Sequence, residues 1–373
     1  MSGLQKAKDF FFGGPQNESR PEGPEPSLGP LTAPIGIPGL GPVRAYYLLL
    51  VAILVLFILT KNALVGLLGG LTILFIVAWE FYCGFKAGGI GSEIRETAIA
   101  ILIALVIWFG SGFLLNTSTP INAIVSCSML PTYERGDLVI LQGAPIATQY
   151  VPYAGPASDV NSTAIITYQG QNEVVDGSML AHCANAAASG GAGGPASGAD
   201  AWCPAFLQTP QAFVETHGPV VIHYGACPRY YPATGQTRVG ICATSLSVAG
   251  QSAGAIGQAT PTPVPFNASH ELLVYTPAPG ELYSQVGDIV HRAAFALNTT
   301  TGIVYFSKGD NNPIYDFQAY DQNTREGNNP IHQSQIKGKV IARVPYLGNL
   351  KLFITPQVLV GGATAGCDSY YIH

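Results

Sequence analysis

The chain has 373 residues, of which 48% are apolar and only 10% are charged, and its net charge is −5. Soluble globular proteins carry about a quarter charged residues, so much of this chain is expected to face something other than water. The mildly negative balance and the lack of a basic patch argue against a nucleic-acid partner. No zinc-finger or P-loop spacing is present.

The first 42 residues are rich in Pro and Gly, which cannot bury a core, so this tail is predicted to be flexible. Three apolar runs follow within residues 43–116, and they cover 45–60, 63–85 and 97–115. About 20 apolar residues span a bilayer, so the second and third runs predict transmembrane helices. The first run is shorter, but we expect it to span as well, because Arg44 can extend its charge to the membrane surface.

Basic residues predict how these helices are oriented. Four precede the first run, namely Lys6, Lys8, Arg20 and Arg44. Lys86 and Arg95 lie between the second and third runs, whereas the first turn holds only Lys61. Because basic residues mark cytoplasmic loops, the tail is predicted to be cytoplasmic and everything after Leu115 extracytoplasmic. Glycosylation sequons on the outer side agree, and they begin at Asn116, Asn161, Asn267 and Asn298. The sequence therefore predicts a multi-pass protein of the cell membrane.

Four of the seven cysteines cluster in the outer part of the chain, at Cys183, Cys203, Cys227 and Cys242. An extracytoplasmic compartment permits disulfides. Four cysteines allow three connectivities, which the sequence leaves open, although we favour pairing in sequence order, Cys183 with Cys203 and Cys227 with Cys242. No Cys-x-x-Cys pair occurs among them, so we expect no metal site. Cys83, inside the second apolar run, is interpreted as an apolar side chain.

Short strand-like segments with Gly and Pro between them follow the apolar runs and predict an all-β outer domain. Residues 117–143 and 271–350 carry most of these segments, including "GDLVILQ", "ELLVYTP" and "DIVHRAAFAL". Residues 144–270, with a Gly/Ala/Ser tract, are interpreted as an inserted region of mostly strands and loops. Residues 351–373 are apolar but contain Pro356, and we expect them to lie on the membrane surface rather than form a weak fourth span. The predicted fold class is thus transmembrane helices followed by a mostly-β extracytoplasmic domain with a large insertion.

Three separated stretches together fit nucleophilic catalysis, namely "SCSMLPT", "GDIVHRA" and "SKGDNNPIYD". A serine hydroxyl is a poor nucleophile at neutral pH and needs a neighbouring base. Histidine is the usual base, and a carboxylate fixes its tautomer. Each stretch alone is ordinary, because a loop serine is usually a solvated hydroxyl and "GDNNP" is usually a turn. Their combination just beyond a predicted span indicates a hydrolytic site.

The stretch "SCSMLPTYERGDLVIL" resembles the catalytic box of type I signal peptidases. "GDIVHRA" and "FSKGDNNPIYD" resemble the second and third boxes of the archaeal and endoplasmic-reticulum branch of that family, whose base is histidine. "KGKVIARVPYLGNL" resembles the closing strand of the same branch. The resemblance covers about residues 97–144 and 271–350, with the four boxes in the family's order. The tail, the first two apolar runs and the insertion lie outside it.

This resemblance implies a signal-peptidase-like β fold and a role for each matching residue. Ser128 is expected to be the nucleophile and His291 the general base and acid. Asp316 is expected to orient His291, with Asp310 as the alternative, which could instead pin its loop. Ser126 and the Ser128 backbone N–H are expected to form an oxyanion hole.

The sequence departs from the family's pattern in two ways. Cys127 stands between the serines where another small residue is more usual, and more than a hundred inserted residues separate the serine and histidine boxes. Activity therefore requires that residues 144–270 loop out and leave these boxes adjacent. Lys308 lies in the third box and not at the histidine position, so it is not expected to act as the catalytic lysine of the bacterial branch. Arg135 and Asp137 are interpreted as structural residues of a turn.

The resemblance implies a membrane-bound serine endopeptidase that removes signal peptides from secreted precursor proteins without a metal or other cofactor. Its partners would be secretory precursors and membrane lipid, and a contact with the protein translocation channel is a further option. Two alternatives stay open. One is a membrane-anchored surface-binding protein that uses the insertion on a peptidase-like scaffold. The other is a peptidase of the same fold that is specific for pilin-like or surface-layer precursors.

Overall fold

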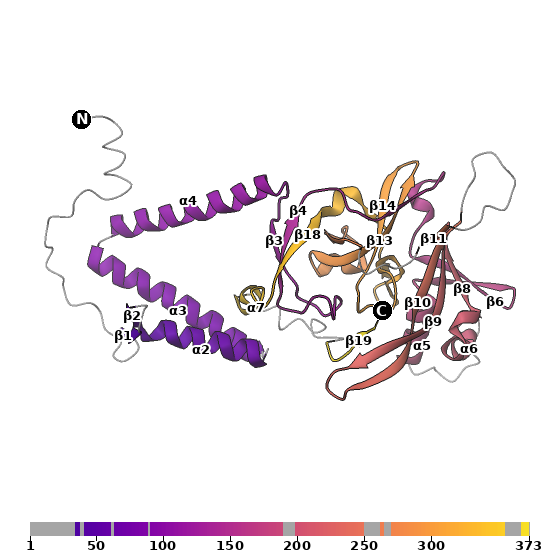
Figure 1. Ribbon diagram of the computed structural model, residues 1–373, viewed down its shortest axis with the longest axis horizontal. Helices are drawn as coiled ribbons and strands as arrows, with labels where there is room; N and C mark the ends of the chain where they lie inside the picture. The colour runs from indigo at the N-terminus through magenta and orange to yellow at the C-terminus, as the bar shows by residue number, and fades with distance from the viewer. Residues whose placement is uncertain are drawn as a thin grey trace.

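The computed structural model describes residues 34–37, 41–60, 63–88, 90–188, 198–249, 262–264, 270–354 and 367–372. Figure 1 shows the long helices at one end of the molecule and the two large β-sheets at the other. Most of the tail predicted to be flexible lies outside the described residues. Its last part forms two short antiparallel strands, β1 (Pro34–Ile37) and β2 (Gly41–Arg44).

The three apolar runs form the helices α2 (Ala45–Thr60), α3 (Ala63–Gly88) and α4 (Ile90–Leu114). Two segments are long and apolar enough to cross a membrane, Leu64–Cys83 in α3 and Thr97–Leu114 in α4. Their apolar side chains are largely exposed on the protein, as suits contact with lipid. Helix α2 has 16 residues. At 1.5 Å per residue it rises only about 24 Å, less than the hydrocarbon core of about 30 Å. The described helices therefore include two potential spans, where the sequence predicts three.

A short helix, α7 (Asn349–Ile354), joins the β domain to the helices. Its Phe353 and Leu352 are buried against Ile53 and Phe57 of α2. Gly69 of α3 leaves the space for the Phe353 ring, because a Cβ at this position would overlap the ring. Residues 355–366, which hold most of the apolar segment predicted to lie on the membrane surface, are outside the described residues. The chain then returns to the β domain at Cys367, which is disulfide-bonded to Cys127.

The first sheet contains the strands expected from residues 117–143 and 271–350. Its described strands are β3 (Ile121–Ala123), β4 (Leu138–Gln142), β5 (Gln149–Pro152), β12 (Leu272–Tyr275), β13 (Ile289–Thr299), β14 (Gly302–Lys308), β17 (Ile331–His332) and β18 (Ile336–Val344). Their order is β17-β14-β13-β12-β18-β4-β3, with β5 added parallel to β13, and the sheet curls into a half-barrel. Strands β15 (Tyr320–Asp321) and β16 (Glu326–Gly327) form a separate hairpin. Strand β3 is an edge strand of the curled sheet.

The inserted region forms a second sheet. Its described strands are β6 (Thr163–Tyr168), β7 (Gln171–Asp176), β8 (Val214–His217), β9 (Val220–Tyr231), β10 (Gln236–Val248) and β11 (Thr262–Val264), and the C-terminal β19 (Tyr370–Tyr371) pairs with β9. Besides its strands and loops, the described part of the region contains helices α5 (Met179–Ala188) and α6 (Cys203–Gln208). The run "MLAHCANAAA" is rich in alanine, the residue with the highest helix propensity.

One apolar core joins the two sheets. Phe206 and Phe213 of the insertion belong to the same buried cluster as Phe295, Phe306 and Phe317 of the first sheet and its loops. Phe295 and Phe306 stack with ring centroids 4.2 Å apart, and Phe317 meets Phe306 edge-on at 5.1 Å. The insertion does loop out between the serine and histidine boxes, but it packs back onto the sheet that carries them.

Both favoured disulfides form. Cys183 pairs with Cys203 and Cys227 with Cys242, while Cys83, buried in α3, forms no disulfide. The third disulfide, between Cys127 and Cys367, was not predicted. Its half-cystines are 240 residues apart in the sequence, so no local pattern points to it.

Candidate active site

The two serines lie in the loop that connects β3 to β4, and the backbone around this loop is held by several hydrogen bonds. Ile124 N–H donates to Asp137 O at 2.8 Å, and Gly136 N–H donates back to Ile124 O at 2.8 Å. Arg135 Nε–H donates to Val125 O at 2.9 Å, just before Ser126. Arg135 and Asp137 therefore have the structural role predicted for them.

A second loop, which follows β14, packs against the serine loop. Asn311 N–H donates to Ser128 O at 2.7 Å, and Asn311 Nδ2 donates to Cys127 O at 3.0 Å. Gly309 lies so close that a Cβ there would stand 2.6 Å from Ser128 O. Real Cβ contacts of this length essentially never occur, so this close approach requires glycine. The "GDNN" run thus holds the carbonyl side of Ser128 in place.

Ser128, His291 and Asp316 lie in one line of hydrogen bonds. Ser128 Oγ is 2.8 Å from His291 Nε2, and His291 Nδ1 is 2.6 Å from Asp316 Oδ2. An ionised carboxylate only accepts hydrogen bonds, so Nδ1 carries the proton and Nε2 of the neutral ring accepts from the Ser128 hydroxyl. His291 is on β13, opposite Leu273 of β12, and is only 4% exposed. The three residues singled out in the sequence are therefore brought together.

The Asp316 carboxylate is buried and surrounded by donors. Besides His291, its Oδ2 accepts from the Tyr275 hydroxyl at 3.1 Å and from the Ser307 hydroxyl. Its Oδ1 is buried and has no hydrogen-bond partner among the described residues. Burial, and next the negative charge of Asp316, raise the pKa of Tyr275 well above its ordinary value, so its hydroxyl stays protonated and donates. Tyr275 and Ser307 were not foreseen, although Ser307 lies in the third box.

Asp310, the alternative partner of His291, has a different environment. Arg292 donates two hydrogen bonds to the Asp310 carboxylate, from Nε to Oδ1 at 2.8 Å and from Nη2 to Oδ2 at 2.7 Å. Thr132 Oγ1 also donates to Asp310 Oδ2, at 2.6 Å. Both side chains of the Arg292–Asp310 pair are buried. This pair ties the loop after β14 to β13 and to the serine loop. Of the two aspartates, Asp316 contacts His291, and Asp310 holds the loop.

A cleft of about 460 Å³ opens beside Ser128. One wall is residues 123–129, and the other is formed by Tyr283, Val286, residues 288–291, Asn311 and Asn312. Ser126 lines the cleft, and its Oγ lies 3.1 Å from Ser128 Oγ. The Ser128 N–H donates to no acceptor among the described residues. These two donors therefore lie at the nucleophile side of an open cleft, as an oxyanion hole requires.

Lys308, at the end of β14, is 2% exposed beside this site. Burial lowers its pKa from the ordinary 10.5 to about 8, partly offset by the negative charges of Asp310 and Asp316. The side chain of His291 lies within hydrogen-bond distance of Ser128 Oγ, at 2.8 Å.

The lowered pKa of Lys308 predicts a pH dependence of stability. Between about pH 8 and 10.5 the unfolded chain binds a proton on Lys308 that the folded chain has lost. The free energy of unfolding therefore rises with pH in this window, on the order of 3 kcal/mol in total for this group. We expect Lys308→Met to remove this rise, as measured by denaturant unfolding at about pH 7 and about pH 10. The matched control is Lys339→Met, since Lys339 is half-buried and pairs with Glu271 at 2.6 Å. Parallel pH dependences in wild type and Lys308→Met would contradict the prediction.

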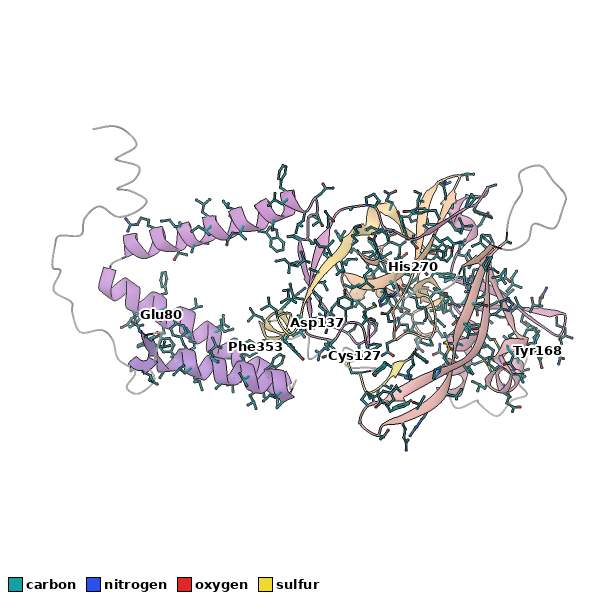
Figure 2. All side chains as sticks on the ribbon, in the orientation of Figure 1. Glu80, Cys127, Asp137, Tyr168, His270 and Phe353 are labelled. Atoms are coloured by element: carbon teal, nitrogen blue, oxygen red, sulfur yellow. A yellow bond between two sulfur atoms is a disulfide. The ribbon has the colours of Figure 1, made fainter. Side chains whose placement is uncertain are left out.

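The position of this site along the molecule is clear in Figure 2. Cys127, between the two serines, is labelled on the side of the β domain that faces the helices. Phe353, which packs against α2, and Asp137, which holds the serine loop, are labelled close by. The cluster therefore lies near the ends of the potential membrane spans.

No protein-family model matches this chain, and a search of curated proteins found no match either.

Proposed function

We propose that this protein is a membrane-bound serine endopeptidase that removes signal peptides from secretory precursors. The observation that supports it most is the line of hydrogen bonds from Ser128 Oγ through His291 to Asp316, at 2.8 Å and 2.6 Å, opening on a cleft. A serine, a neutral histidine that accepts from it and a buried carboxylate are the parts that nucleophilic acyl transfer requires.

In the proposed reaction, Ser128 Oγ attacks the scissile carbonyl carbon while His291 Nε2 takes the hydroxyl proton. Asp316 stabilises the resulting imidazolium and keeps its orientation. The oxyanion accepts hydrogen bonds from Ser126 Oγ and the Ser128 N–H. His291 then gives its proton to the leaving amine, which breaks the peptide bond and leaves an acyl ester on Ser128. A water molecule, deprotonated by His291, attacks this ester, and the departing Ser128 oxygen takes the proton back.

The cleft indicates how a substrate would lie. Strand β3 is an edge strand, so an extended peptide can pair with its free side through main-chain hydrogen bonds. Ala123, Ile124, Ile289 and Val290 give the cleft apolar walls. Such walls suit small apolar side chains, as in the Ala-x-Ala pattern before a signal-peptide cleavage site.

The proposed topology places the N-terminal tail in the cytoplasm and the β domain outside. Helices α3 and α4 are the two potential spans, and this topology also requires α2 to cross, because an odd number of crossings puts the tail and the β domain on opposite sides. Since α2 is short, the bilayer around it would have to be thinned. Helix α4 ends seven residues before β3, so it would hold the cleft close to the outer membrane surface, where precursors emerge.

The direct test uses the purified full chain in lipid nanodiscs and a precursor protein with an Ala-x-Ala signal peptide. We expect one cut directly after the second alanine, located by mass spectrometry of both products. A matched precursor with Trp at the two alanine positions should stay intact, because the indole side chains would be too large for the part of the cleft that binds the alanines. No cleavage of the first precursor, or equal cleavage of both, would contradict the proposal.

A further inference from the structure

The inserted region and the C-terminal segment reach the Ser–His–Asp cluster at two places. The first is the serine loop. Strand β19 pairs with β9 of the insertion, Tyr370 opposite Tyr230 and Tyr371 opposite Arg229. Three residues before this strand, Cys367 is disulfide-bonded to Cys127, the residue between Ser126 and Ser128. Residues 367–372 therefore connect the second sheet covalently to the serine loop.

Asn311 strengthens this connection. Its Nδ2 donates to Cys127 O and to Ser369 O, both at 3.0 Å, and its Oδ1 accepts from Tyr371 N–H at 3.3 Å. Tyr371 also packs against the Cys227–Cys242 disulfide that joins β9 to β10. One buried amide thus holds the serine loop and the C-terminal segment together, next to the proposed nucleophile.

The second place is the segment that carries Asp316. Gln318, two residues further on, is fully buried, and its Nε2 donates to Glu215 of β8 and to the Tyr224 hydroxyl of β9, the latter at 2.9 Å. Gln318 Oε1 accepts from Tyr315 N–H at 2.8 Å, which fixes the turn that contains Asp316.

Glu215 is itself fully buried, and both of its carboxylate oxygens have hydrogen-bond partners. Besides Gln318, it accepts from Met179 N–H, the Tyr224 hydroxyl and His217 Nε2, each at 2.8 Å. His217 Nδ1 lies 2.9 Å from Asn161 O, so both ring nitrogens lie against oxygen atoms. A buried polar network with its partners in place is rigid and costly to disturb.

We propose that the inserted region positions the Ser128–His291–Asp316 triad, with Cys367 holding the Ser128 side and Gln318 holding the Asp316 side. Cys367 and Gln318 are positioning residues, since each acts through another residue and neither lines the cleft. This inference rests on the proposed peptidase function and gives the insertion a role in it. It differs from the reading of the insertion as an independent binding module, because these contacts end on the two arms of the triad.

The experiment compares two variants that each remove a disulfide, in the full chain in nanodiscs. Cys127→Ser/Cys367→Ser cuts the connection to the serine loop. Cys183→Ser/Cys203→Ser is the matched control, because that disulfide lies inside the insertion and touches neither arm of the triad. Thermal unfolding establishes that both variants are folded, and cleavage of the Ala-x-Ala precursor gives kcat and KM separately.

We expect Cys127→Ser/Cys367→Ser to lower kcat by about 10- to 100-fold with KM changed less than about 2-fold, because small displacements of reacting groups cost rate rather than binding. The control should keep wild-type kcat. Gln318→Met keeps all disulfides and a side chain of similar shape. It should lower kcat by about 10-fold and again change KM by less than about 2-fold. This variant still tests the positioning role if the disulfide variant does not fold.

The outcomes separate the two proposals. Wild-type kcat in folded Cys127→Ser/Cys367→Ser and in Gln318→Met, with activity still dependent on Ser128, would overturn the positioning role alone. An equally large loss of kcat in Cys183→Ser/Cys203→Ser and in Cys127→Ser/Cys367→Ser would overturn it too, because the effect would then come from a general loss of rigidity. An inactive wild-type protein would overturn the peptidase function and this inference with it.

Discussion

Ser128→Ala is expected to lower kcat for precursor cleavage by at least about 10⁴-fold, because it removes the only atom that forms the acyl ester. The substitution removes one oxygen from a loop whose backbone is held by Asn311 and Arg135, so the fold should remain. KM should change little, since the cleft walls are untouched. Stopped-time cleavage assays measure the rate, and thermal unfolding provides the check on folding.

The matched control for this variant is Ser307→Ala, which removes a hydroxyl from the same buried cluster but leaves the proposed nucleophile in place. Ser307 donates to Asp316, so its loss should reduce the rate by much less, about 10-fold. A Ser128→Ala protein that cleaves at the wild-type rate, or one no slower than Ser307→Ala, would remove Ser128 from the mechanism.

Asp316→Ala is expected to lower kcat by about 10⁴-fold, because His291 loses both its orienting partner and the charge that stabilises its imidazolium. Asp316→Asn should be milder, about 10²-fold. Tyr275 and Ser307 donate to the same oxygen that accepts from His291 Nδ1, so the carbonyl oxygen of the asparagine would take this place and preserve the tautomer. Only the charge would be lost.

Asp310→Ala distinguishes the two aspartates. It leaves the buried Arg292 guanidinium without its carboxylate partner, which typically costs about 3–5 kcal/mol of stability. Its main effect should therefore appear in the free energy of unfolding, and the folded fraction should keep more activity than Asp316→Ala. The reverse order of the two rates would make Asp310 the orienting residue and contradict the assignment.

Much of the architecture could be predicted because local patterns control it. The long apolar runs became helices, and the shorter segment "DIVHRAAFAL" became part of β13, in which nearly every residue is buried. The approach of Ser128, His291 and Asp316 was expected from the resemblance of their three stretches to the boxes of type I signal peptidases. Helix α2 has the same bounds as the first apolar run, so its short length as a span was already visible in the sequence.

Contacts between distant parts of the chain were not predictable from local patterns. Cys127 was interpreted as a small residue, whereas its disulfide to Cys367 closes over 240 residues. No local pattern marks the polar side chains of Gln318 and Glu215 as buried, yet both are fully buried and hydrogen-bonded to each other. Such pairs depend on how the insertion folds back onto the first sheet, and that is decided by the shared core around Phe206, Phe213 and Phe306.

The central claim is that His291 makes the Ser128 hydroxyl reactive. The most direct measurement is the rate at which a fluorophosphonate, which loses fluoride when a serine oxygen attacks its phosphorus, labels the wild-type chain and His291→Ala. Peptide mass spectrometry then locates the adduct. We predict an adduct on Ser128 in the wild type and a rate lower by at least about 10³-fold in His291→Ala. An adduct on another residue, or equal rates in the two proteins, would contradict the account.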